Sequence, residues 1–192
     1  MKFLSFDCAI KTLGYTICEI KKINLNELYN ENDLNSVLQT LKSLITITHK
    51  KTIDISADDD INIIRNLCNY VEKNIYPIID QSYTVLMELQ MNPNQKSKMI
   101  EISLMTLFAK YNIKTVGSSL KNKVALTEHG RYYHFAKKYS RKYANKKHCI
   151  YNFSIIEKLF TTTNEKSDSH IADSFMQVLG YIIFSTKNSL FL

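Results

Sequence analysis

The chain has 192 residues, 45% of them hydrophobic, which suits one domain with a substantial core and is too short for two of ordinary size. No apolar run approaches the roughly 20 residues that cross a bilayer, and the four cysteines form no CxxC pair. We therefore expect no membrane span and a reducing, intracellular setting. The net charge of +7 lies in the basic segment, residues 131–148, which has seven Lys or Arg and no acid, and outside it the two signs balance at 18 each. A localised positive surface predicts a polyanionic partner, with nucleic acid the leading candidate.

The first part of the chain predicts β-structure. Apolar runs at 3–7 and 13–20, separated by a turn that contains Gly14, predict a β-hairpin. Residues 43–56 predict a third strand at the edge of the same sheet. Residues 21–43 are polar and Asn-rich, and they predict no definite element.

Helices and strands alternate in the rest of the chain. Acidic residues at 58–60 predict the start of a helix that ends at Pro77. Its apolar positions recur at helical spacing: Ile61, Ile64, Leu67, Cys68 and Val71. A buried strand at 83–90 precedes a helix at 95–110, with core candidates Met99, Ile102, Leu104, Met105, Leu107 and Phe108. A strand at 113–119, a short helix at 151–160 and a long helix from about 168 to 187 complete the series. The order β-β-β-α-β-α-β-α-α indicates one α/β domain over residues 1–192.

Four residues stand out as candidate metal ligands. Two predicted strands end on a carboxylate, Asp7 and Glu88, and a buried carboxylate needs a cation or hydrogen-bond donor. His170 and Asp173 are neighbours on one face of the final helix. Three acids and an imidazole from distant segments could converge on Mg²⁺ or Mn²⁺. Each residue alone has a simpler explanation. Asp7 could form a turn, and Glu88 could pair with a lysine. His170 and Asp173 could lie in the solvated first turn of a helix. The combination of these four residues and their order along the chain favours a metal site.

At these residues the sequence resembles the RuvC-like Holliday junction resolvases, most of all those of poxviruses and related large DNA viruses. The first motif is matched by DCAIKTLGY (7–15), an Asp followed by a small residue two positions later and by Gly-Tyr. VLMELQ (85–90) resembles the second motif and HIADSF (170–175) the last. The sequence departs from the family at Ala9, where Gly is usual, at His170, where Asp is commoner, and in a long insertion between Gly14 and Glu88.

The resemblance implies an RNase H-like fold, with a mixed five-stranded sheet flanked by helices. It also implies a Mg²⁺-dependent endonuclease, with Mn²⁺ able to substitute, that resolves four-way DNA junctions by paired phosphodiester hydrolysis with two ions. Asp7 would bind both ions, with Glu88 and Asp173 on opposite sides. His170 would be a ligand or a group that orients or donates a proton, and Asp168 is an alternative ligand. A homodimer is implied because a two-fold enzyme matches a two-fold junction. If the source is viral, the enzyme would act in the host cytoplasm.

Several cations are expected to contact DNA. Lys121 and Lys123 follow a predicted strand and resemble the resolvase segment that places a basic residue near the scissile phosphate, where one would stabilise transition-state charge. A solvent-facing turn is the alternative. The full set of expected DNA contacts is Lys121, Lys123, Arg131, Lys137, Lys138, Arg141, Lys142, Lys146 and Lys147. Tyrosines within the basic segment could stack on opened bases or belong to a helix core.

Two other functions fit the same residues. One is a different RNase H-like nuclease, acting on RNA·DNA hybrids or on another branched DNA. The other is a catalytically inactive nucleic-acid-binding module, against which the three retained acids argue. The Met- and Leu-rich helix at 95–110 is the candidate dimer interface, with ordinary core packing as the alternative.

Overall fold

The structure is a computed structural model that describes residues 1–21, 40–89, 95–124, 140–160 and 169–189. At 123, 141–142, 157–160 and 183–189 it describes the backbone alone. Across these ranges, none of the helices is long and apolar enough to span a membrane.

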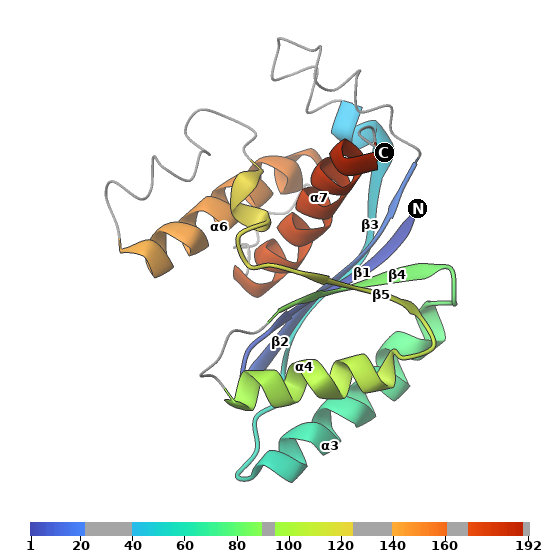
Figure 1. The fold of residues 1–192 in the computed structure, drawn as a ribbon, viewed down its shortest axis with the longest axis vertical. Coiled ribbons are helices and arrows are strands. Elements are labelled where there is room, and N and C mark those ends of the chain that lie inside the picture. Colours follow the sequence, from blue (N-terminus) through green and yellow to red (C-terminus); the bar gives the residue numbers. More distant parts are fainter. Residues whose placement is uncertain (22–39, 90–94, 125–139, 161–168, 190–192) are drawn as a thin grey trace.

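Five strands form one mixed sheet in the order β3-β2-β1-β4-β5 (Figure 1). The strands are β1 (Lys2–Cys8), β2 (Thr12–Ile20), β3 (Ile45–Asp54), β4 (Tyr83–Glu88) and β5 (Asn112–Val116). The first three strands pair antiparallel, whereas β1 with β4 and β4 with β5 pair parallel. The predicted mixed five-stranded sheet is confirmed.

Helices cover both faces of the sheet (Figure 1). One face packs against α3 (Asp60–Tyr70), its π-helical continuation η1 (Val71–Ile75) and α4 (Gln95–Leu107). The other face packs against α6 (Arg141–Phe160) and α7 (Ser169–Ser189). Two short 3₁₀ turns, η2 (Tyr76–Ile78) and η3 (Lys121–Lys123), complete the described elements. The helix was predicted to end at Pro77. This residue lies in η2, the 3₁₀ turn that directly follows the π-helical segment.

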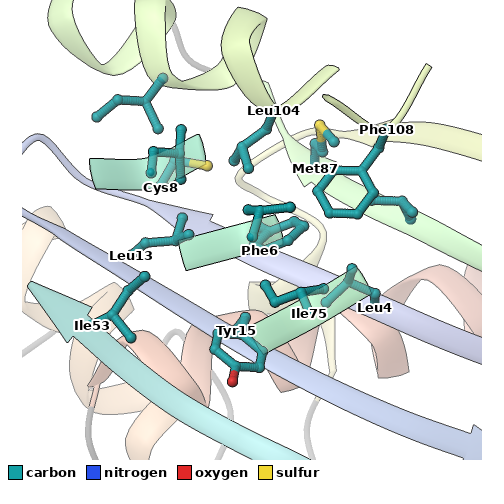
Figure 2. Close-up of a cluster of buried hydrophobic side chains, with 14 of the residues drawn as sticks. Leu4, Phe6, Cys8, Leu13, Tyr15, Ile53, Ile75, Met87, Leu104 and Phe108 are labelled. Atoms are coloured by element: carbon teal, nitrogen blue, oxygen red, sulfur yellow. The ribbon is translucent and has the colours of Figure 1, made fainter. Parts of the chain in front are cut away.

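The two faces of β1 differ in chemistry because side chains alternate along a strand. Leu4, Phe6 and Cys8 point toward α3 and α4, into an apolar cluster that Figure 2 shows with Leu104 and Phe108 above the strand. Ser5 and Asp7 point the other way and hydrogen bond to side chains of α7. The α3/α4 side of β1 therefore supplies core packing, while the α7 side presents polar groups.

The structure corrects one predicted helix. A helix was expected at 151–160, whereas α6 begins at Arg141 and includes the end of the basic segment. Among the described side chains of α6, the buried ones recur at helical spacing: Ala144, His148, Cys149, Asn152, Phe153 and Ile156. The stripe was missed because two of its members are polar.

Two isoleucines of the apolar helix patterns lie outside the core, and the prediction that Ile102 belongs to the core is wrong. Ile61 on α3 and Ile102 on α4 are 70% and 54% exposed. Ile63 and Ile100, each two positions away, are buried in their place. In both helices the apolar residues cover more than one face, so the pattern left the buried stripe undetermined.

Candidate active site

Parallel pairing places two carboxylates side by side at one edge of the sheet. Phe6 of β1 pairs with Met87 of β4, so Asp7 and Glu88, which follow them, lie at the carboxyl ends of adjacent strands. Both residues are almost fully buried, at 8% and 9% exposed. This edge is where parallel strands commonly present functional groups.

The start of α7 rests directly on β2 at Gly14. Gly14 pairs with Asp7 in the sheet, and a Cβ added to it would lie 2.4 Å from His170 Cβ and 2.7 Å from the His170 carbonyl carbon. Only a glycine leaves room for the helix at this position. A 2.7 Å hydrogen bond between the Thr16 and Ser174 hydroxyls fixes the same contact one turn further along α7.

This contact joins His170 to Asp7. His170 Nδ1 lies 2.6 Å from Asp7 Oδ2, and His170 Nε2 lies 3.1 Å from the Thr12 hydroxyl. A carboxylate oxygen only accepts, so Nδ1 carries the proton, and in the neutral ring Nε2 then accepts from Thr12. Both ring nitrogens are thus engaged, and the imidazole orients Asp7.

Lys121 lies at the centre of the carboxylates. Its Nζ is 2.9 Å from Glu88 Oε2, 2.9 Å from Asp173 Oδ2 and 3.8 Å from Asp7 Oδ1, and the residue is 6% exposed. Burial alone would lower the pKa of this ammonium, but the three carboxylates, Asp173 first, outweigh burial and raise the pKa above its ordinary value. Lys121 is therefore charged in the site.

A buried amide supports Glu88 from behind. Gln177 Nε2 donates to Glu88 Oε2 at 2.8 Å, and Gln177 Oε1 accepts from the Ser5 hydroxyl at 3.1 Å. Gln177 and Ser5 are fully buried. Both ends of the amide are thus fixed, and the Glu88 carboxylate is held in place.

The turn that carries Lys121 is held by α6 and α7. His148 Nε2, 3.3 Å from the Lys121 carbonyl, donates to it, and Asn122 Nδ2 donates to Asn145 Oδ1 at 3.1 Å. On α7, Gly180 lets Leu120 approach, because an added Cβ would lie 3.0 Å from the Leu120 carbonyl oxygen. The backbone of Lys121 is thus anchored on both sides.

The charge of the cluster fits a divalent cation. Three carboxylates and one ammonium leave a formal charge of −2 when His170 is neutral. Asp173 Oδ1 is buried and makes no hydrogen bond of normal geometry with a described residue, although the weakly donating Cys149 thiol influences it. Burial raises the pKa of Asp173, and Lys121 opposes that shift. An unsatisfied carboxylate oxygen among hard oxygen donors matches the ligand preference of Mg²⁺ and Mn²⁺.

The cluster is nevertheless not arranged as a finished metal shell. Within the described ranges, no three His, Cys, Asp or Glu side chains already surround one common metal position. The carboxylates instead converge on the Lys121 ammonium.

The structure brings together Asp7, Glu88, His170, Asp173 and Lys121, all from the predicted site. Their roles stay predictions. The side chain of Lys123 is not described, and Asp168, Arg131, Lys137 and Lys138 lie outside the described residues. Arg141 and Lys142 have only their backbone described, in the first turn of α6.

The basic face of α6 includes Lys146 and Lys147, which are exposed. Lys147 Nζ lies 5.6 Å from the ring centroid of Tyr143, a tyrosine that is 53% exposed. Tyr143 is therefore a surface aromatic beside a cation, whereas His148, at the end of the basic segment, is fully buried.

Three supporting residues were missed by sequence reasoning: Thr12, His148 and Gln177. A signal for Gln177 exists, because the polar residues of α7 at 170, 173, 174 and 177 follow helical spacing within an otherwise apolar face. Thr12 and His148 carry no such pattern, since each acts on a segment far away in the chain.

Comparisons with known proteins identify the fold. No protein-family model and no curated protein sequence matches the chain. Among solved structures, Thermus thermophilus RuvC matches with a TM-score of 0.61 at 10% identity, over 98% of this chain and 97% of that protein. The chain has the RuvC fold. T. thermophilus RuvC with a Holliday junction substrate matches at a TM-score of 0.57 and 12% identity, over 97% of this chain and 96% of the other.

The fowlpox virus resolvase in complex with Holliday junction DNA also matches. Its TM-score is 0.53 at 19% identity, over 95% of this chain and 97% of that protein. The predicted RNase H-like fold class is therefore confirmed. At these identities the likeness establishes the fold, and the activity has to be argued from the site.

Proposed function

We propose that the chain is a divalent-metal-dependent endonuclease that resolves four-way DNA junctions. The observation that carries this proposal is the convergence of Asp7, Glu88 and Asp173 around Lys121 at the strand edge of a RuvC fold. The cluster has the donor chemistry and the negative charge that Mg²⁺ or Mn²⁺ requires. Two of the matching structures are complexes with Holliday junction DNA, which supports that substrate class.

Each residue of the site has a proposed role. Asp7, Glu88 and Asp173 would hold the metal, which when bound supplies an activated water and offsets charge on the phosphate. His170, with both ring nitrogens engaged, positions Asp7 through the 2.6 Å hydrogen bond. Gln177 positions Glu88, and Lys121 contributes positive charge toward the scissile phosphate.

Paired cuts on opposing strands require two active sites, so we propose a homodimer with each protomer folded as one domain. Helix α4 remains the candidate interface. Its Ile102 side chain is 54% exposed, while Met99 and Met105 are only partly buried against the core. A helix with exposed apolar groups on its outer side suits a symmetric contact.

The DNA would be held by the exposed cations of α6 and by the rest of the basic segment. Phosphate neutralisation by Lys and Arg supplies affinity without sequence preference, which suits recognition of a junction by its shape. Tyr143, exposed beside Lys147, would stack on an unpaired base.

The decisive test compares cleavage of a four-way junction and of a linear duplex with the same sequence, each with Mg²⁺ or EDTA. We expect symmetric cuts in the junction when Mg²⁺ is present and no cuts in EDTA. Asp7→Asn should abolish cleavage and preserve junction binding, because it removes a charged ligand at almost constant shape. A duplex cut as fast as the junction would refute the resolvase assignment and favour another RNase H-like nuclease. Binding without cleavage by the unaltered chain would favour an inactive binding module.

A further inference from the structure

Lys121 occupies an unusual position for a phosphate-contacting residue. Its ammonium is buried and paired with carboxylates, at 2.9 Å from Glu88 Oε2 and 2.9 Å from Asp173 Oδ2. A lysine that contacts a DNA phosphate would be expected to point toward solvent, from which the DNA approaches. Here the charge is directed inward instead.

The partners of Lys121 are the proposed metal ligands. A bound Mg²⁺ needs oxygen ligands at about 2.0–2.1 Å in near-octahedral geometry. Glu88 Oε2 already accepts hydrogen bonds from both Lys121 and Gln177, and Asp173 Oδ2 accepts one from Lys121. An ammonium and a divalent ion cannot share these oxygens at close range, because like charges repel strongly in a buried site.

The arrangement of the candidate metal ligands also indicates that Lys121 and a metal ion compete for the same oxygens. No three donors in the described part of the chain surround a common metal position, although three carboxylates approach one ammonium. Among the carboxylates of the cluster, Asp173 Oδ1 is a buried oxygen without a hydrogen bond of normal geometry to a described residue, so it is a ligand for an incoming ion.

We propose, on the basis of the proposed function, that Lys121 is an internal counter-ion that a divalent metal displaces from the carboxylate cluster. Without metal, its ammonium holds three like charges together and keeps the site folded. With metal, the ammonium leaves Glu88 and Asp173 and becomes available to the DNA phosphate. One residue thus serves the two states of the enzyme in turn.

The surrounding contacts allow this exchange. The backbone of Lys121 is anchored, because its carbonyl accepts from His148 and the next residue, Asn122, is bound to Asn145. A fixed main chain with a flexible four-carbon stem lets the ammonium move while the turn stays in place. The displaced charge would therefore stay within one side-chain length of the metal site.

The first experiment measures Mn²⁺ affinity by calorimetry for the unaltered chain, Lys121→Met and Lys98→Met. Lys98 is a matched control, because it also pairs with a buried carboxylate, Glu101, at 2.9 Å, but on the opposite side of the sheet. We expect Lys121→Met to bind Mn²⁺ on the order of tenfold more tightly, since the competitor is gone. Lys98→Met should bind like the unaltered chain. Equal or weaker binding by Lys121→Met overturns the proposal.

The second experiment needs no variant and decides the matter if Lys121→Met does not fold. Lysines of the unaltered chain are acetylated with and without Mn²⁺, and each site is quantified by mass spectrometry. We expect Lys121, which is 6% exposed in the structure, to be protected in EDTA and to become reactive with Mn²⁺. Lys96, which is 55% exposed, should react equally in both. Protection of Lys121 in both conditions overturns the displacement.

These outcomes separate the two proposals. If the unaltered chain neither binds Mn²⁺ nor cuts junctions, the proposed function and the displacement both fail. If it binds Mn²⁺ and cuts, while Lys121→Met shows no gain in affinity and Lys121 stays protected, the nuclease stands and the displacement alone fails.

Discussion

Replacement of Gly14 by alanine should damage both the stability and the site, because it forces α7 away from the sheet. The added Cβ would lie 2.4 Å from His170 Cβ, whereas two carbon atoms pack at about 3.5–4.0 Å. The start of α7 must therefore withdraw by about 1 Å or more. The 2.6 Å contact between His170 Nδ1 and Asp7 Oδ2 would then exceed ordinary hydrogen-bond length.

The expected magnitudes follow from this displacement. Overpacking of this kind lowers the free energy of unfolding by about 1–3 kcal/mol. For a domain of this size, each kcal/mol lowers Tm by about 2–4 °C, so we expect a fall of roughly 2–12 °C. A displacement of about 1 Å in a catalytic geometry costs about a hundredfold in rate, which is the larger and more specific effect.

The assay is thermal unfolding in EDTA together with junction cleavage in Mg²⁺, below the Tm of the variant. Gly117→Ala is the matched control, because its added Cβ meets nothing closer than Ser119 Oγ at 3.9 Å. It should stay within about 0.5 kcal/mol of the unaltered chain and cleave normally. Normal Tm and cleavage for Gly14→Ala would show that α7 does not rest on β2 at this point.

Three further predictions test the supporting residues and surfaces. Gln177→Met should weaken Mn²⁺ binding by about 10–100-fold, as loss of a residue behind a metal ligand usually does, and unchanged affinity would remove its positioning role. Ile102→Asp should convert a dimer to a monomer in sedimentation, whereas Ile61→Asp, at a still more exposed isoleucine of α3, should not; dimers in both would place the interface elsewhere. Lys147→Ala should reduce the slope of log binding constant against log salt by about one, and an unchanged slope would mean that this face of α6 does not contact DNA.

The sequence predicts part of the site well because of the chemistry of individual positions. Asp7 and Glu88 each end an apolar run. Burial of a carboxylate there costs free energy unless a cation or a hydrogen-bond donor compensates its charge. Once the sheet is mixed and β1 pairs parallel with β4, the two acids must be neighbours. The i, i+3 spacing of His170 and Asp173 likewise determines that they share a helix face.

Other features depend on tertiary contacts that leave no local pattern. Lys121 and Lys123 lie in one short turn, and only packing determines that Lys121 enters the carboxylate cluster. Burial of His148 requires the Lys121 carbonyl as its partner, which is 27 residues away. For Ile102, the apolar residues around α4 allow several buried stripes, and the sheet selects one.

The long sequence separation within the site has a consequence for synthesis of the protein. Asp7 and His170 are 163 positions apart, and Ser5 and Gln177 are 172 apart. At about 5–20 residues per second, a ribosome needs roughly 10–30 s between the first strand and the helix that completes the cluster. Over that interval Asp7 exists without its histidine partner, and the contacts of α7 with β1 span nearly the full domain. A chain interrupted before α7 therefore lacks His170 and Asp173, so the proposed nuclease has no active partial product.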